Sequence, residues 1–272
     1  MLFDQISEAV QFIRQRTDMN PTWGIVLGTG LNQLAEAIQD AQAIDYQDIP
    51  HFPASTVEGH RGQLIFGQLA GVPVVAMAGR FHYYEGYSLQ QVTFPIRVMK
   101  ALGVGKTVIS NAAGSVNPTH EIGDLVFIKD HINLLPDNPL RGPNDERLGP
   151  RFPDMLHTYD RDLLEKAMAT AKEQGYRAHT GVFAVLSGPN LETPAEYTFL
   201  HRIGADLAGM STVPEVLVAR HSGMKIFAVS VVTDLGYPPE AIRFTTHEDV
   251  LAAANNAAPK LQFIVEKLIS TV

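Results

Sequence analysis

The sequence predicts an α/β protein: one domain, residues 1–272, with a central β-sheet flanked by helices. The first observation is that short apolar runs rich in β-branched residues, such as 72–77 and 225–232, alternate with segments whose apolar residues have helical spacing, such as 160–174. Such alternation is typical of proteins in which helices cover a sheet. The second observation is size, because 272 residues that are 45% hydrophobic can bury a large core. No internal repeat, low-complexity tract or linker divides the chain, so one domain is the simplest interpretation.

Local patterns predict the elements of the N-terminal half. Ile6, Val10 and Ile13 have the spacing of one helix face. Ala70-Gly71 separates two apolar runs, which predicts a hairpin. Pro95 lies inside a helical pattern and is expected to kink it. The expected elements are a helix at 4–16, a strand at 23–27, a helix at 31–38, strands at 64–69 and 72–77, a helix at 88–102 and a strand at 106–110.

The C-terminal half continues the alternation. The stretch 136–153 is rich in Pro, Gly, Asn and Arg and is long for a plain connector, so we expect a functional loop. Pro194 suits the first turn of a helix. The expected elements are strands at 124–135, 179–186 and 225–232, and helices at 160–174, 193–202, 213–222 and 247–269.

Composition excludes several classes of function. The chain has no cysteine, which excludes disulfides, thiolate metal sites and cysteine nucleophiles. Its formal charge of −8 argues against a nucleic-acid surface, so an anionic ligand must be held by a few local cations. No carboxylate–histidine cluster has metal-site spacing, and we expect no metal. No targeting segment or membrane-length apolar run is found, which predicts a soluble cytoplasmic protein with no membrane partner.

The segment 79–87, Gly-Arg-Phe-His-Tyr-Tyr-Glu-Gly-Tyr, is the most informative part of the chain. It follows a predicted buried strand, and the ends of such strands are where α/β enzymes place ligand groups. Arg80 and His82 are two apart on an extended segment and therefore point the same way. Together they offer a forked cation and a second donor to an anion. The alternative is that Arg80 pairs with a surface carboxylate and the tyrosines only pack.

Other candidate segments also follow predicted strands. Gly28-Thr29-Gly30 lets a ligand come close to the backbone and offers a hydroxyl and a following helix N-terminus, all of which favour the binding of phosphate. A dinucleotide fingerprint would need glycine at position 33, where the chain has Gln33, so a simple anion loop is favoured over a nicotinamide site. The small residues of 111–115 would let backbone amides approach a flat or anionic ligand. A tight turn and dense packing, without any ligand, remain the alternatives for these two segments.

The C-terminal half supplies carboxylates, a hydroxyl and an imidazole. Glu192 and Ser211 stand at predicted helix starts, where a dipole interaction or a cap would explain them equally well. Thr233-Asp234 ends the last predicted strand, and His247 opens the last helix, where a structural role is the alternative. The absence of a Gly-x-Ser-x-Gly elbow argues against a serine hydrolase. Together the segments offer donors for phosphate, two carboxylates and apolar walls for an uncharged ligand.

As an ordered set, these segments resemble the trimeric purine nucleoside phosphorylases along nearly the whole chain. The resemblance implies a mixed sheet, partly barrel-like, flanked by helices. It also implies reversible phosphorolysis, in which a purine (2′-deoxy)ribonucleoside and orthophosphate give free base and (deoxy)ribose 1-phosphate, with no cofactor. The matching segments are 27–31, 58–62 (Glu-Gly-His-Arg-Gly), 79–87, 111–115, 142–147, 151–153, 188–193 and 209–215.

Residue roles are carried over from the resemblance. Phosphate is expected against Thr29, Arg80, His82, Ser211 and the Ala112 amide, with His60 near its entrance. Tyr84 and Met210 are expected to line the ribose and His247 to meet its 5′-hydroxyl. Glu192 is expected to accept from the purine N1–H, and Asp234, beside Thr233, to face N7 and the 6-substituent. Phe152 is expected to cover the ribose of a neighbouring subunit, which makes a homotrimer part of the site. The residues expected to act in catalysis are Asp234, Glu192 and His82.

Three positions depart from the family pattern. Thr29 replaces a serine and keeps the hydroxyl, whereas Leu191 replaces a phenylalanine and is expected to weaken base stacking. Asp234 replaces an asparagine. An ionised Asp only accepts hydrogen bonds and suits the 6-amino group of adenine, whereas Glu192 suits the N1–H of 6-oxopurines. A protonated Asp234 would reconcile the two, since burial raises a carboxyl pKa. It would then donate to O6 or hand its proton to N7. We therefore expect inosine and guanosine as main substrates, with some adenosine cleavage.

Other activities remain open at this point. A methylthioadenosine phosphorylase of the same fold usually has an apolar residue in place of His247 and no glutamate in place of Glu192. A nucleosidase would use water instead of phosphate. A nucleoside-binding protein without activity is disfavoured because so many expected phosphate ligands are present.

Overall fold

The computed structural model of this chain describes residues 1–54 and 61–272, and its strands form one mixed sheet. The strands are β1 (Trp23–Val26), β2 (Gln39–Asp45), β3 (Gln63–Leu69), β4 (Val72–Ala78), β5 (Lys106–Ser115), β6 (Leu125–Asn133), β7 (Ala178–Val185), β8 (Leu207–Gly209) and β9 (Lys225–Leu235). Their order across the sheet is β2-β3-β4-β1-β5-β8-β7-β6-β9. A further pairing of β5 with β9 closes the strands from β5 onward into a barrel. The predicted α/β fold with a mixed, partly barrel-like sheet is confirmed.

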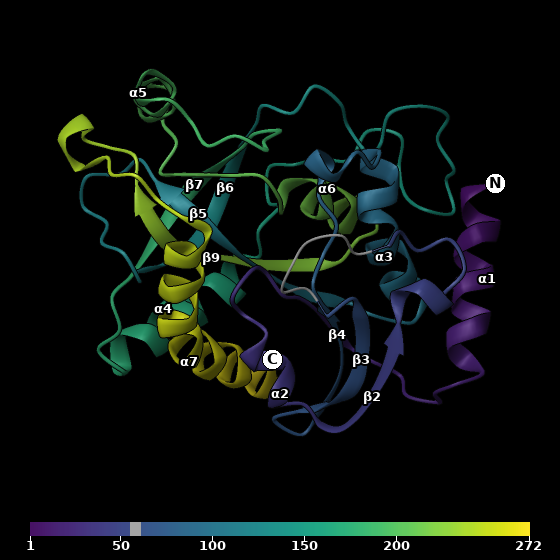
Figure 1. Cartoon of the computed structure of the whole chain (residues 1–272). Coiled ribbons are helices and arrows are strands. Elements are labelled where there is room, and N and C mark those ends of the chain that lie inside the picture. The colour runs from purple at the N-terminus through teal and green to yellow at the C-terminus, as the bar shows by residue number, and fades with distance from the viewer. Residues whose placement is uncertain (55–60) are drawn as a thin grey trace.

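Helices cover the sheet on two sides (Figure 1). The helices are α1 (Leu2–Arg14), α2 (Gln33–Glu36), α3 (Leu89–Ala101), α4 (Arg161–Glu173), α5 (Pro194–Arg202), α6 (Val213–His221) and α7 (His247–Thr271). On one side α1 packs on α3 and α3 on α6, whereas α2 and α4 pack on α7. Of the helices in the described ranges, none is long and apolar enough to cross a membrane.

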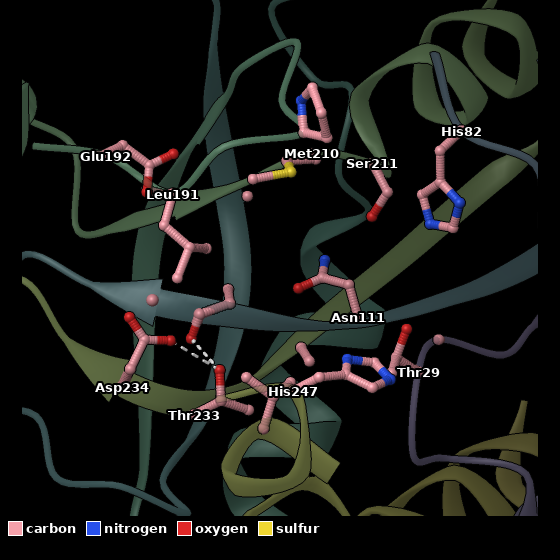
Figure 2. Close-up of a pocket in the computed structure, with 18 of the residues that line it drawn as sticks. Thr29, His82, Asn111, Leu191, Glu192, Met210, Ser211, Thr233, Asp234 and His247 are labelled. Atoms are coloured by element: carbon pink, nitrogen blue, oxygen red, sulfur yellow. Dashed lines mark hydrogen bonds between the residues drawn. The ribbon is translucent and has the colours of Figure 1, made fainter. Parts of the chain in front are cut away.

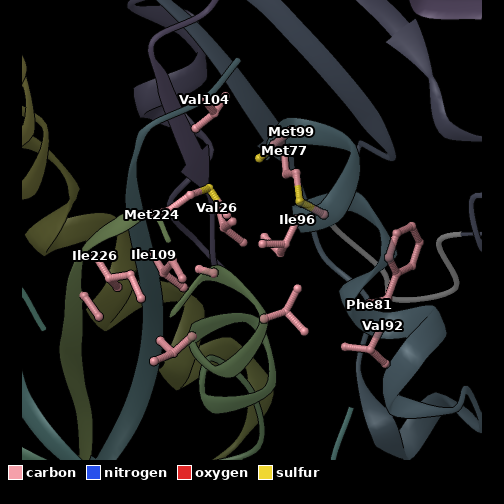
Figure 3. Packing of buried hydrophobic residues seen from close by; sticks show 14 of the residues in the cluster. Val26, Met77, Phe81, Val92, Ile96, Met99, Val104, Ile109, Met224 and Ile226 are labelled. Carbon is pink, nitrogen blue, oxygen red and sulfur yellow. The ribbon is translucent and has the colours of Figure 1, made fainter. Parts of the chain in front are cut away.

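Two large apolar clusters hold the layers together. In the first, Val26 of β1 and Ile109 of β5 pack with Ile96 and Met99 of α3 (Figure 3). Neighbouring residues of the same strands point to the other face, where Val108 and others meet α7. Strands that are buried on both faces have continuous apolar runs in the sequence, and such runs are the pattern that predicted these strands. Each fully buried large apolar side chain contributes roughly 1.5–3 kcal/mol to folding.

Several elements differ from the sequence prediction. Strand β2 was not expected, because it is an edge strand whose residues 39–43 are all exposed and carry no apolar alternation. Its antiparallel pairing with β3 begins at Gln39, so the helix expected at 31–38 is reduced to α2. Strand β8 spans only three residues and was also missed. Pro95 lies inside α3, which continues from Leu89 to Ala101.

Strands β5 and β9 are longer than the apolar runs that predicted them. They pair in parallel from Lys106 opposite Lys225 to Ser115 opposite Leu235, with a shift in register between Ala113 and Gly114. The small residues of 111–115 are therefore strand residues, held by the partner strand rather than by their own apolar pattern. The expectation that 111–115 lies beyond its strand was wrong, since these residues lie within β5. Thr233 and Asp234 lie near the end of β9, which runs to Leu235 and not to 232 as predicted.

Candidate active site

A cavity of about 400 Å³ lies where the ends of β1, β4, β8 and β9 meet the C-terminal part of β5 (Figure 2). It is large enough for a small-molecule ligand. Most of the residues expected at the site line it, although they come from segments far apart in the chain. These lining residues are Thr29, Arg80, His82, Tyr84, Ala112, Leu191, Glu192, Met210, Ser211, Thr233, Asp234 and His247.

Two expected residues are not among them. His60 lies outside the residues that the structure describes. Phe152 does not line the cavity, and its side chain is 86% exposed on the loop that precedes α4. Its expected role in a neighbouring subunit is consistent with exposure but stays a prediction.

The anion loop Gly28-Thr29-Gly30 is held tightly against β5. The Gly28 amide donates to the Ser110 hydroxyl, which in turn donates to the Val26 carbonyl. A Cβ on Gly28 would lie 2.7 Å from the Asn111 Cα, so only glycine allows this close approach. The loop thereby places the Thr29 side chain at the cavity wall.

Arg80 is fully buried, with 1% of its surface exposed, and its guanidinium donates hydrogen bonds to other groups of the protein. One terminal nitrogen donates to the Thr212 hydroxyl at 3.1 Å and to the Glu215 carboxylate at 3.4 Å. The other donates to the carbonyl groups of Val26 and Ser110. Burial lowers the pKa of Arg80, and the nearby Glu215 carboxylate opposes that shift. The pairing with a carboxylate that sequence reasoning allowed is therefore present, but the carboxylate is buried rather than on the surface.

His82 is held in one orientation by its neighbours. The Glu85 carboxylate accepts from the His82 backbone N–H at 2.7 Å and lies 2.9 Å from the ring Nδ1. The ring also stacks on Tyr84, with centroids 4.7 Å apart and planes at 14°. The carboxylate and the stacked ring together fix the direction in which the imidazole faces the cavity.

The start of α6 has a strained backbone beside the cavity. Thr212 is buried and has φ of +73°, a conformation that costs a β-branched residue about 1–3 kcal/mol. Its hydroxyl accepts from Arg80 and, at 2.8 Å, from the Asn111 side-chain amide. This turn directs Ser211 toward the cavity (Figure 2). Backbone strain beside a ligand cavity is typical of functional sites.

Asn111 lines the cavity but was not named individually from the sequence. Within the described ranges, its Oδ1 is buried and has no hydrogen-bond partner. A buried acceptor without a partner is costly, which makes Asn111 a candidate contact for a ligand donor. The sequence does not single out Asn111 as a contact, because it shows only that 111–115 is a segment of small side chains.

Glu192 and Asp234 face the opposite end of the cavity from His82 and Ser211 (Figure 2). Burial raises the pKa of Asp234, although hydrogen bonds from Thr233 and Tyr197 oppose the shift. Burial also raises the pKa of Glu192, and the negative charge of Asp234 adds to the effect. Two carboxylates whose pKa values are raised in one cavity are typical of a site that handles protons.

Tyr197, on the first turns of α5, was missed by sequence reasoning. Its side chain is 5% exposed and lines the cavity, and its hydroxyl lies beside the carboxylates of both Glu192 and Asp234. Burial raises the pKa of the phenol strongly, and the two carboxylates raise it further. From the sequence, Tyr197 is indistinguishable from a tyrosine that packs α5 against the core.

Between the two ends, the cavity has apolar walls. Met210 and Leu191 lie on one side (Figure 2), and Val250 of α7 also lines the cavity. Gly188 leaves room for Met210, since a Cβ there would lie 2.3 Å from its sulfur. A ligand with an anionic end and a flat polar end joined by a less polar middle would fit these surroundings.

Known proteins are similar to this chain in sequence and in fold. Residues 22–270 match the sequence model of the family described as the phosphorylase superfamily. The chain is 48% identical to purine nucleoside phosphorylase 1 of Geobacillus stearothermophilus, over 95% of this chain and 94% of that protein. It is 45% identical to the purine nucleoside phosphorylase of Bos taurus, over 99% of this chain and 96% of that protein.

Solved structures give the same result. The crystal structure of Schistosoma mansoni purine nucleoside phosphorylase in complex with inosine has a TM-score of 0.94 and 45% identity, over 99% of this chain and 96% of that one. The structure of the Schistosoma mansoni enzyme in complex with adenosine also has a TM-score of 0.94 and 45% identity, over 99% of this chain and 97% of that one.

Proposed function

Since this chain belongs to the purine nucleoside phosphorylases of the phosphorylase superfamily, we propose that its cavity binds orthophosphate at one end and a purine at the other. The reaction is reversible phosphorolysis of a purine nucleoside to free base and pentose 1-phosphate. The observation that carries the placement is the separation of groups in the cavity. The Thr29 and Ser211 hydroxyls and the His82 imidazole gather at one end, and the two carboxylates lie at the other. The buried Arg80 guanidinium belongs to the first end, because it donates to Thr212 beside Ser211.

The phosphate end is assigned to Thr29, His82, Ser211 and the Ala112 amide, with Arg80 behind them. Hydroxyls and amides donate to phosphate oxygens, and the helix start after Ser211 favours negative charge. Arg80 contributes positive charge from within the wall and holds Thr212 in its strained turn. His60 remains assigned to the entrance from the sequence alone.

The purine end is assigned to Glu192 and Asp234, with Leu191 and Met210 as apolar contacts. Tyr84 and Met210 would line the ribose, Thr233 would support Asp234, and His247 at the start of α7 would meet the 5′-hydroxyl. Inosine and guanosine are the main substrates in this proposal, because an ionised Glu192 accepts from their N1–H group. A minor activity on adenosine follows from Asp234.

The charges of the site match those that develop in the reaction. Breaking the glycosidic bond leaves positive charge on the sugar and negative charge on the departing purine. Phosphate beside C1′ stabilises the first, and a hydrogen bond or proton delivered to N7 stabilises the second. Holding both reactants in one cavity supplies much of the remaining acceleration, and the reaction needs no covalent intermediate.

We also propose that the enzyme is a homotrimer in which Phe152 covers the ribose in the site of a neighbouring subunit. Phe152 and Leu156 are large apolar side chains that are 86% and 77% exposed. Exposed apolar side chains close together on one loop are typical of a surface that a partner covers.

Release of base from inosine, guanosine and adenosine, each with and without phosphate, tests the function. The proposal expects release only with phosphate, and fastest from inosine and guanosine. Equal release without phosphate would identify a nucleosidase instead. Binding without turnover would identify a nucleoside-binding protein.

A further inference from the structure

One hydroxyl lies between two carboxylates at the purine end of the cavity. The Tyr197 hydroxyl lies beside the carboxylates of both Glu192 and Asp234, and all three side chains line the cavity. The ring cannot move away easily, because Gly236 packs against it so closely that a Cβ there would lie 2.4 Å from the ring. The phenol therefore has a fixed position, with a carboxylate on either side.

A count of protons shows that this arrangement is incomplete when both carboxylates are ionised. The Thr233 hydroxyl lies 2.9 Å from Oδ1 of Asp234 and 3.2 Å from the Ala113 carbonyl, both of which are then only acceptors. Tyr197 likewise faces two acceptors. Each hydroxyl has a single proton to donate. The two hydroxyls therefore face four acceptors in all but have only two protons to donate. One further proton, on either carboxylate, provides a donor for one more of these contacts.

The surroundings also favour one negative charge over two. Within the described ranges, no Lys or Arg forms an ion pair with Glu192 or Asp234. Glu196, the other charged group that acts on Glu192, is also negative. Arg243 and Asp249 line an adjoining hollow together with Asp234. The positive charge of Arg243 and the negative charge of Asp249 offset each other there. Two adjacent carboxylates in a partly buried site hold a proton more readily than either alone.

We propose that Glu192 and Asp234 together hold one proton, which Tyr197 passes between them, and that the bound base decides which carboxylate carries it. This inference rests on the proposed placement of the purine. A 6-oxopurine has a donor at N1 and an acceptor at O6, so it fits an ionised Glu192 and a protonated Asp234. Adenine has an acceptor at N1 and a donor at its 6-amino group, so it fits a protonated Glu192 and an ionised Asp234.

The exchange between the two forms conserves protons. A protonated Glu192 gives its proton to the phenol oxygen while the phenol gives its own proton to Asp234. Two O–H bonds form and two break, and no proton enters or leaves the site. The same charge state of the enzyme thus accepts both classes of base, which two independent carboxylates would not do.

Isothermal titration calorimetry tests the shared proton directly. Hypoxanthine and adenine are each titrated into the wild-type enzyme at pH 7 in two buffers of different ionisation enthalpy, which counts the protons exchanged on binding. The proposal expects close to zero protons for both bases. Uptake or release of about one proton with either base overturns it, because the proton is then not already in the site.

Asp234→Asn is the matched variant. It leaves Glu192 as the single carboxylate of the pair, so adenine should now take up about one proton and hypoxanthine none. If adenine binding to the variant exchanges no proton, Glu192 is not the group that donates to N1 of adenine and the proposal fails.

Tyr197→Phe separates proton sharing from packing. The phenol stabilises the singly protonated pair, so its loss should narrow, from both sides, the pH range in which kcat/KM is near its maximum for inosine and adenosine alike. Unchanged pH limits would assign Tyr197 a packing role only. Phosphate-dependent base release by the wild type distinguishes failure of this inference from failure of the proposed function.

Discussion

Gly114 lies opposite Asp234 in the parallel pairing of β5 with β9, and a Cβ at position 114 would lie 2.7 Å from Oδ2 of Asp234. Because Asp234 projects from a strand within the sheet, a neighbouring side chain would displace it. The absence of a side chain at position 114 is therefore what gives the carboxylate its place.

Gly114→Ala should push Asp234 out of position. We expect kcat/KM for inosine and adenosine to fall about ten-fold or more, since overpacking of this kind costs about 1–3 kcal/mol. Gly105→Ala is the matched control, because a Cβ at position 105 meets nothing within 4 Å. Steady-state kinetics of both variants check this, and equal activity of the two would show that Asp234 tolerates the added methyl group.

Arg80→Ala should raise the Michaelis constant for phosphate at least ten-fold or abolish turnover, while free purine base still binds. The change also leaves Glu215 as an uncompensated buried charge, which costs about 3–5 kcal/mol of stability. Adding Glu215→Gln should restore much of the melting temperature without restoring phosphate affinity. Phosphate kinetics of the double variant that match the wild type would remove Arg80 from the phosphate site.

Asp234→Asn should lower phosphorolysis of adenosine and leave inosine turnover comparable or better. An amide donates to O6 without needing a proton, but it no longer shares a proton with Glu192. The ratio of kcat/KM for adenosine to that for inosine is the measurement. A ratio equal to that of the wild type would mean that Asp234 does not read the 6-position of the base.

A homotrimer completed by Phe152 predicts complementation between subunits. Phe152→Ala and Asp234→Ala should each be poorly active alone, whereas mixed oligomers should recover part of the activity. Recovery follows because an intact Phe152 of one subunit then covers a site with an intact Asp234 in another. Light scattering under assay conditions gives the oligomeric state, and a fully active monomer would contradict the proposal.

The lowered pKa of Asp124 predicts that the folded protein loses stability in acid. Burial raises its pKa, but hydrogen bonds from Arg177, the Glu121 amide and His179 outweigh burial, and the net pKa is below the ordinary value. A lowered folded-state pKa contributes stability above the unfolded pKa, which is lost as pH falls through the folded value. Asp124→Asn should lower the free energy of unfolding at pH 7 by about 1–3 kcal/mol, with half-exposed Arg177 limiting the effect. Denaturant titrations at pH 7 and at about pH 2, which is below the unfolded pKa of about 3.9, should then show a smaller loss in the variant; an equal loss would assign the acid sensitivity to other groups.

Some features of this protein follow from the sequence because their causes are local. Ser88 and Thr193 cap α3 and α5 by accepting from amides three residues later, within reach of any chain that folds there as a helix. The hairpin of β3 and β4 turns at Ala70 and Gly71, both with positive φ, between two apolar runs. The candidate residues of the cavity lie in short segments of unusual composition, and the resemblance of those segments to the purine nucleoside phosphorylases assigned their roles.

Other features depend on which distant segments meet, and only the tertiary structure decided them. The ends of β5 and β9 are strands because they pair with each other across more than 100 residues of chain, although 111–115 has little strand character alone. Tyr197 became a site residue because α5 sets it between Glu192 and Asp234. Glu215 reached Arg80 because α6 packs on α3 and β9. Local patterns determine where elements begin and which groups are available, whereas register and packing determine which of those groups face one another.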